Sequence, residues 1–137
     1  MAQDLATFVR LAELRLEEAK VLLANGQPSG AYYLAGYAVE CALKAKIAGG
    51  FRENEIPDLK RVRSIYTHDL SGLLELAGLK KALDEERDHN SRLYARWMVI
   101  KTWSESARYS VWTELDASAM LAALEGDDGL LRWLQKH

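Results

Sequence analysis

The sequence predicts an all-α fold, an antiparallel up-and-down helical bundle of four to five helices that forms a single domain over residues 1–137. The stretch Ala31–Ala48 is apolar on nearly every face and rich in alanine, which is a strong helix former. The stretch Leu5–Asn25 carries one apolar stripe at helical spacing. Only Pro28 and Pro57 interrupt the chain, so long helices are permitted.

The first two predicted helices form an antiparallel pair. The stripe of the first helix consists of Phe8, Ala12, Leu16, Ala19 and Leu23. Asp4 is a candidate N-cap, and Gly26 ends this helix. Because the link at residues 26–29 is short, the helix over Ala31–Ala48 runs back alongside the first. Its uninterrupted apolar part stops at Glu40, which is too short for a membrane span of about 20 residues, so we expect it at the centre of a bundle.

The middle of the chain predicts a connection followed by a helix. Residues 51–66 mix charges of both signs and show no clean period, which indicates a long connection. A helix opens at residues 67–70, THDL, where the side chain of Thr67 or Asp69 can accept a hydrogen bond from a free N–H group. Gly78 stops or kinks this helix before a further, mostly solvated helical stretch.

The last third predicts a buried helix, a break and two more helices. Arg92–Trp103 should be helical and largely buried, whereas residues 104–113 interrupt the pattern with Ser, Arg and aromatic residues. Asp116 is expected to cap the last long helix. A turn at residues 126–129, GDDG, leads to a short final helix at 130–137.

Composition narrows the classes of function. The formal net charge is −2 and the pI is about 5.9, which argues against a general cationic coat for nucleic acid but leaves room for a local basic site. Cys41 has no partner for an intrachain disulfide and is expected to be an inert core residue in a reducing cytoplasm. We find no targeting or membrane segment, so the expected location is cytoplasmic. The sequence carries no metal or cofactor motif, so we predict no metal and no cofactor.

Polar residues line one face of the central helix. Tyr33, Tyr37, Glu40 and Lys44 follow each other at spacings of four, three and four. Glu40 needs a partner or an opening to water, because a buried unpaired charge costs several kcal/mol. One interpretation is an intrahelical pair of Glu40 with Lys44 on a partly exposed face. The alternative is a polar seam that lines a cleft or a dimer interface, with Lys44 available for phosphate.

Two further positions carry candidate chemistry. His68 precedes a helix start beside Asp69, where it can either help to cap and pack the helix or help to bind an anion or orient a base. Arg108 and Tyr109 lie in the break between two helices and are flanked by tryptophans. This arginine can merely stack and hold the loop, or contact phosphate while neighbouring rings stack on bases. A third feature, the basic cluster LKRVR at 59–63, is either a solvated face or a phosphate-contacting edge.

The ordered set of these motifs resembles the HEPN domain family. The matching elements are the Tyr-rich opening of AYYLAGYAVECALKAKIA, its core at 38–44, the THDL helix start and the Arg108-Tyr109 pair before the last long helix. The resemblance covers roughly residues 5–125 and implies an antiparallel bundle that commonly dimerises. Family members act as partners of minimal nucleotidyltransferases, as substrate-binding domains of larger ones and as toxin ribonucleases.

The ribonuclease members carry an Arg followed, after four to six residues, by a His near the start of the last long helix. Here Arg108 stands in about the right place, but the permitted His positions hold Thr113, Glu114 and Leu115. The bare pattern also occurs at 63–68 and at 132–137, in places that do not match the family. The sequence therefore favours a binding role over ribonuclease activity of the known type.

Three hypotheses follow. The first is a non-catalytic module, expected to be a homodimer, that binds a nucleotide or RNA or partners a minimal nucleotidyltransferase. Its ligand-binding residues around one cleft would be Tyr37, Glu40, Lys44, His68, Asp69, Arg108 and Tyr109. The second is a ribonuclease toxin, with Arg108 and a substitute acid/base, His68 or Glu114, as catalytic candidates. The third is an antitoxin-like or scaffold dimerisation module without a small ligand.

Overall fold

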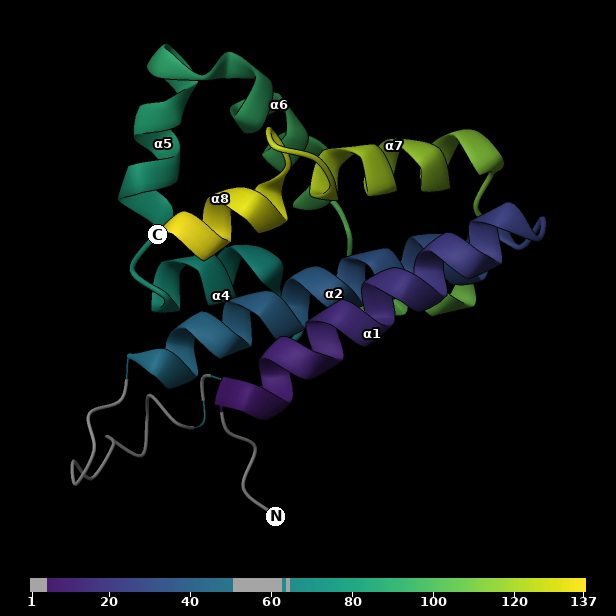
Figure 1. The fold of residues 1–137 in the computed structure, drawn as a ribbon, viewed down its shortest axis with the longest axis horizontal. Helices are drawn as coiled ribbons and strands as arrows, with labels where there is room; N and C mark the ends of the chain where they lie inside the picture. The colour runs from purple at the N-terminus through teal and green to yellow at the C-terminus, as the bar shows by residue number, and fades with distance from the viewer. Residues whose placement is uncertain (1–4, 51–62, 64) are drawn as a thin grey trace.

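The computed structural model describes residues 5–50, 63 and 65–137 (Figure 1). These residues form helices and no strand, which confirms the predicted all-α class. The helices are α1 (Leu5–Ala24), α2 (Pro28–Gly49), α4 (Leu70–Leu76), α5 (Lys80–His89), α6 (Ser91–Ile100), the 3₁₀ helix η1 (Glu105–Tyr109), α7 (Glu114–Leu124) and α8 (Leu130–Lys136). The described part of the chain thus holds more helices than the four or five predicted, because its second half folds into several short ones.

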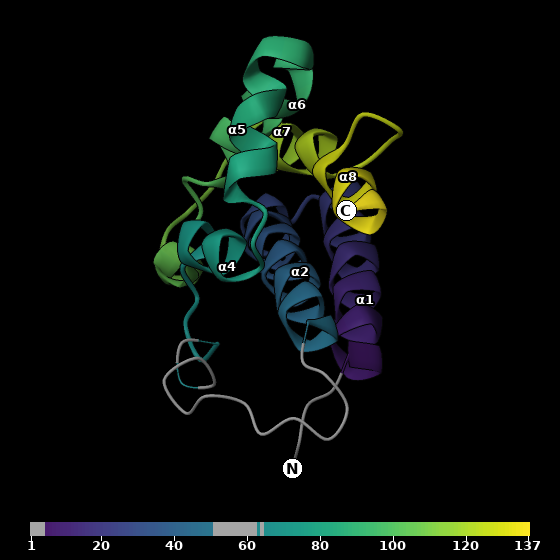
Figure 2. The same cartoon turned by 90° about the vertical axis from the view of Figure 1, so that its left-hand side faces the viewer.

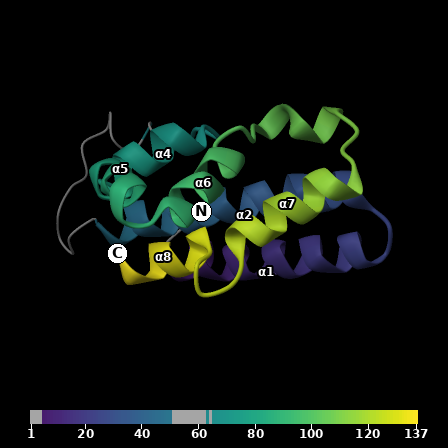
Figure 3. The same cartoon turned by 90° about the horizontal axis from the view of Figure 1, so that it is seen from above.

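The two long helices α1 and α2 lie side by side and run antiparallel (Figures 1 and 3). Gly26, with a φ of 74°, ends the turn after α1 as predicted, because a glycine adopts this left-handed conformation without steric cost. α2 begins at Pro28, three residues earlier than the predicted Ala31. The reason is that proline is favourable in the first turn of a helix, where its missing N–H has no helical partner.

α2 is the central helix, and other helices cover it on several sides. Figure 2 shows α4 and α1 on opposite sides of α2. α7 and α8 also pack on α2, while α5 and α6 contact each other and project away from the α1–α2 layer. Half of the residues of α2 are buried, and its buried small residues let these neighbours approach closely.

The predicted start of the last long helix was wrong. Thr113, not Asp116, occupies the N-cap position of α7. The Thr113 side chain accepts a hydrogen bond from the Asp116 backbone N–H at 3.1 Å, and the Asp116 carboxylate accepts one from the Thr113 N–H at 3.0 Å. This reciprocal capping box satisfies two backbone donors, whereas a cap by Asp116 alone would satisfy one.

Other expected boundaries differ by a few residues. α6 ends at Ile100, before the predicted Trp103. Asp69 holds the N-cap position of α4, but its side chain makes no capping hydrogen bond; the Thr67 hydroxyl accepts the Asp69 N–H at 3.2 Å instead. The expected cap at Asp4 lies outside the described residues, and so does the basic cluster at 59–63 except Arg63.

Two properties of the interior bear on function. Cys41 is buried, as predicted, and burial raises the pKa of its thiol to about 12. Among the described residues, no helix combines the length and apolar character that crossing a membrane requires.

Candidate functional site

A buried carboxylate on α2 is the centre of a polar cluster. The side chain of Glu40 is 2% exposed, and both of its oxygens have partners. Oε1 accepts a hydrogen bond from Nδ1 of His68 at 2.7 Å, and Oε2 accepts one from Nζ of Lys44 at 3.3 Å. α4 packs on α2, which brings His68, two residues before the start of α4, against Glu40 of α2. The carboxylate therefore fixes which ring nitrogen of His68 turns inward and leaves Nε2 facing outward.

The outer half of the cluster comes from η1. Nε2 of His68 lies 3.9 Å from Oε2 of Glu105, and the other oxygen of Glu105 lies 3.3 Å from a guanidinium nitrogen of Arg108. Residues three apart on a 3₁₀ helix lie on the same side, so this short turn presents Glu105 and Arg108 together. The His68 and Arg108 side chains are 44% and 47% exposed, so the cluster opens to solvent on this side.

Two tryptophans fix the position of η1 on α2. Trp103 is buried, and its indole lies so close to Gly36 that a Cβ there would be 2.2 Å from the indole nitrogen. Trp112 stacks on Tyr32 with 3.9 Å between ring centroids. The Trp112 indole N–H also donates to the Ala107 carbonyl in η1 at 2.9 Å. These rings are therefore part of the core packing, and neither is positioned as a base-stacking surface.

Tyrosines surround the arginine. The Arg108 guanidinium lies over the ring of Tyr109, 4.8 Å from its centroid, and Tyr109 is 77% exposed. Burial raises the pKa of the Tyr33 hydroxyl, and the positive charge of nearby Arg108 offsets part of that rise. Tyr37, also half-buried, borders the cluster through its ring, 6.0 Å from that of Tyr33. Arg108 thus interacts with one partly buried and one exposed tyrosine.

The structure brings together five of the seven predicted ligand-binding residues, and the other two lie at the edge of this set or outside it. Glu40, Lys44, His68, Arg108 and Tyr109 belong to one continuous set of contacts. Tyr37 is at its edge. The carboxylate of Asp69 instead lies over Gly72, on the first turn of α4.

The expected arrangement around Lys44 needs a correction. The predicted pair with Glu40 is present, but Lys44 is only 11% exposed, so the pair does not lie on a partly exposed face. Its ammonium is occupied by the carboxylate, which leaves Arg108 as the exposed cation of the cluster. Glu105, which links His68 to Arg108, was not predicted; its only signal in the sequence was a spacing of three from Arg108.

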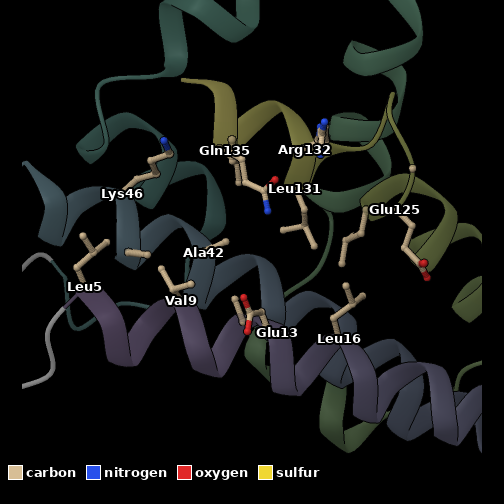
Figure 4. A pocket seen from close by; sticks show the side chains of 15 residues that line it. Leu5, Val9, Glu13, Leu16, Ala42, Lys46, Glu125, Leu131, Arg132 and Gln135 are labelled. Atoms are coloured by element: carbon tan, nitrogen blue, oxygen red, sulfur yellow. The ribbon is translucent and has the colours of Figure 1, made fainter.

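A separate concavity of the described residues lies elsewhere. Figure 4 shows an apolar groove of about 460 Å³ between α1, α2 and α8, lined by side chains such as Val9, Leu16 and Leu131. Its residue Ala42 is two positions beyond Glu40, which places it on the opposite side of α2. The groove and the polar cluster are therefore separate features on two faces of one helix. Sequence reasoning did not identify this groove.

Fold and cluster together define a class: a small all-helical module whose central helix carries a buried carboxylate–histidine pair beside an exposed arginine. The HEPN domain model matches residues 6–135, so the chain belongs to the HEPN domain family. Membership makes it a nucleotide- or RNA-related module in the broad sense. No curated protein and no solved structure matches the chain.

Proposed function

We propose that this protein binds single-stranded RNA or a nucleotide through Arg108, Tyr109 and His68. The observation that carries the proposal is the exposed Arg108–Tyr109 pair, fixed next to His68 by the packing of η1 on α2. A guanidinium can donate two hydrogen bonds to a phosphate, and an exposed aromatic ring provides a stacking surface for any base. These are the two contacts that single-stranded nucleic-acid sites combine.

A binding titration with a five-nucleotide single-stranded RNA tests this proposal. Fluorescence anisotropy of a labelled RNA measures the affinity. Replacing Tyr109 by Ala should weaken binding roughly five- to a hundredfold, since one base–aromatic stack contributes on the order of 1–3 kcal/mol. Arg108→Ala should weaken it and also reduce its salt dependence. Arg87→Ala is the matched control, because Arg87 lies 5.8 Å over Tyr94 in an arginine–tyrosine pair outside the cluster. Equal losses at Arg87 and Arg108 would refute the site.

A second candidate function is metal-independent cleavage of RNA, and the Glu40–His68 pair favours it. A buried carboxylate that holds one imidazole nitrogen leaves the other free to take the proton of a ribose 2′-hydroxyl. The 2′-oxygen would then attack the adjacent phosphorus and expel the 5′-oxygen, which takes a proton from water and leaves as a 5′-hydroxyl, with Arg108 stabilising the charge on the phosphate.

RNA incubated with the protein in EDTA tests this second candidate. Fragments ending in 2′,3′-cyclic phosphate are expected, and His68→Ala should lower the rate by about 10²–10⁴, the usual contribution of general acid–base catalysis. Glu114→Gln should leave the rate unchanged, since His68 and Arg108 share the contact with Glu105 on which this candidate rests. Cleavage that is equally fast in wild type and in Arg108→Ala would exclude this site.

We also propose that the protein acts as a homodimer or with a protein partner such as a minimal nucleotidyltransferase in a toxin–antitoxin-type system. The support is family membership together with two exposed apolar side chains that follow η1 in the sequence, Val111 and Leu115. Light scattering of the purified protein, compared with Val111→Asp, tests for the dimer. A dimer that forms while no nucleotide or RNA binds would favour the purely structural module.

A further inference from the structure

The carboxylate of Glu105 lies between the His68 ring and the Arg108 guanidinium. One of its oxygens faces the Arg108 guanidinium at 3.3 Å, and the other faces Nε2 of His68 at 3.9 Å. A phosphodiester has the same feature, one negative charge shared by two oxygens that can each meet a different donor. Any anion that binds between His68 and Arg108 must therefore displace the Glu105 side chain or share the two donors with it.

The charges of the cluster limit which anions it can accept. Lys44 is neutralised by buried Glu40, and both are almost completely enclosed. The exposed charges are therefore the cation Arg108, the anion Glu105 and, when it is protonated, His68. A ligand with one negative charge meets the least repulsion from Glu105 when it binds at Arg108. A ligand with two to four negative charges meets the remaining Glu105 carboxylate, and its repulsion grows with the ligand charge.

We propose that Glu105 is a specificity-determining residue that makes the site select a single phosphodiester, as in an internal linkage of RNA, over nucleoside mono-, di- and triphosphates. This inference rests on the proposed function, because it assigns the ligand class of the same site. Glu105 acts as an internal competitor whose charge penalises each additional charge on the ligand. The ring of Tyr109, which lies under Arg108, is then free to stack on a base adjoining the bound linkage.

A charge series of ligands tests this inference. Calorimetry with the dinucleoside monophosphate ApA, with AMP and with ATP compares roughly one, two and four negative charges on an adenine ligand. In the wild type, affinity should stay level or fall from ApA to ATP. In Glu105→Gln, binding of ApA should improve about tenfold and that of AMP about a hundredfold, because the Coulomb energy scales with the product of the charges. ATP should gain most, so that in this variant ATP binds more tightly than AMP or ApA.

Glu85→Gln is the matched control, since it removes the same charge from an exposed position on α5 outside the cluster and should leave all three affinities unchanged. Glutamine is close in shape to glutamate, and an unchanged melting temperature would show that Glu105→Gln is folded.

The outcomes separate the two proposals. Suppose that the five-nucleotide RNA binds and that its binding needs Arg108. If Glu105→Gln then raises the affinity for all three ligands equally, or for none, the proposed role of Glu105 is wrong and the binding function stands. Tighter binding of ATP than of ApA to the wild type would also overturn it. If no RNA or nucleotide binds to either protein, the proposed function fails and this inference fails with it.

Discussion

The pair of Glu40 and His68 makes a quantitative prediction about stability. A hydrogen bond to a charged group contributes on the order of 1.5–3 kcal/mol net. The Glu40 end is 2% exposed but the His68 side chain is 44% exposed, so solvent screens part of this value. Lys44 stays paired with the carboxylate when the imidazole is removed. We therefore expect His68→Ala to lower the free energy of unfolding by about 1–2 kcal/mol at neutral pH.

A double-mutant cycle isolates the interaction. Urea denaturation of the wild type, His68→Ala, Glu40→Gln and the double variant should give a coupling energy of about 1 kcal/mol between the two positions. His89→Ala is the control, because His89 is exposed on α5 and its loss should stay within about 0.5 kcal/mol. A coupling energy below about 0.3 kcal/mol, which is the usual error of additivity, would show that the 2.7 Å contact does not hold in solution.

Three further predictions concern the packing that supports the site. Gly36→Ala should destabilise the protein by about 1–3 kcal/mol and change its tryptophan fluorescence, because a Cβ at 2.2 Å from the indole nitrogen would displace Trp103. Unchanged fluorescence and stability would argue against this contact. Thr113→Ala should cost about 1 kcal/mol through the lost helix cap, measured by thermal denaturation. Hydrogen bonds from Thr113 lower the pKa of Asp116 below its usual 3.8, so the cap stabilises the fold fully above that pH. The difference in stability between wild type and Thr113→Ala should narrow at lower pH. Burial raises the pKa of Cys41 from its ordinary 9.0 to about 12. A thiol reagent at pH 8 should therefore label Cys41 only as fast as the protein unfolds, and the free energy of unfolding should decline above pH 9. Rapid labelling of the native protein would contradict the burial.

The sequence predicted the helical class and the central helix because both depend on local pattern. The apolar run of α2 and the stripe of α1 are each visible in a window of about twenty residues, and the helices follow them closely. The start of α7 was missed because both Thr113 and Asp116 are good capping residues, and only the reciprocal pair of hydrogen bonds decides between them. Boundaries of this kind depend on which of two neighbouring side chains folds back.

The candidate site was predicted in part for the same reason. Glu40 and Lys44 are one turn apart on one helix, so their pairing could be read from spacing alone. The contact of Glu40 with His68 joins residues 28 positions apart, and no local pattern specifies it. The role of Glu105 depends on η1, whose position is set by the close approach of Trp103 to Gly36. Spacing cannot reveal such an approach, since it depends on the absence of a side chain in a distant helix.

Glu40 itself is hard to explain by stability. A buried ion pair loses much of its Coulomb energy to desolvation, and a well-packed apolar residue of similar size at such a position is often neutral or stabilising. On this ground leucines at positions 40 and 44 together would serve the core as well as the ion pair. What leucine could not do is hold Nδ1 of His68 and so turn Nε2 toward Glu105 and Arg108. The polar pair in an apolar helix is therefore better understood as the device that positions this imidazole beside the exposed arginine, which is what a phosphate-binding or RNA-cleaving site requires.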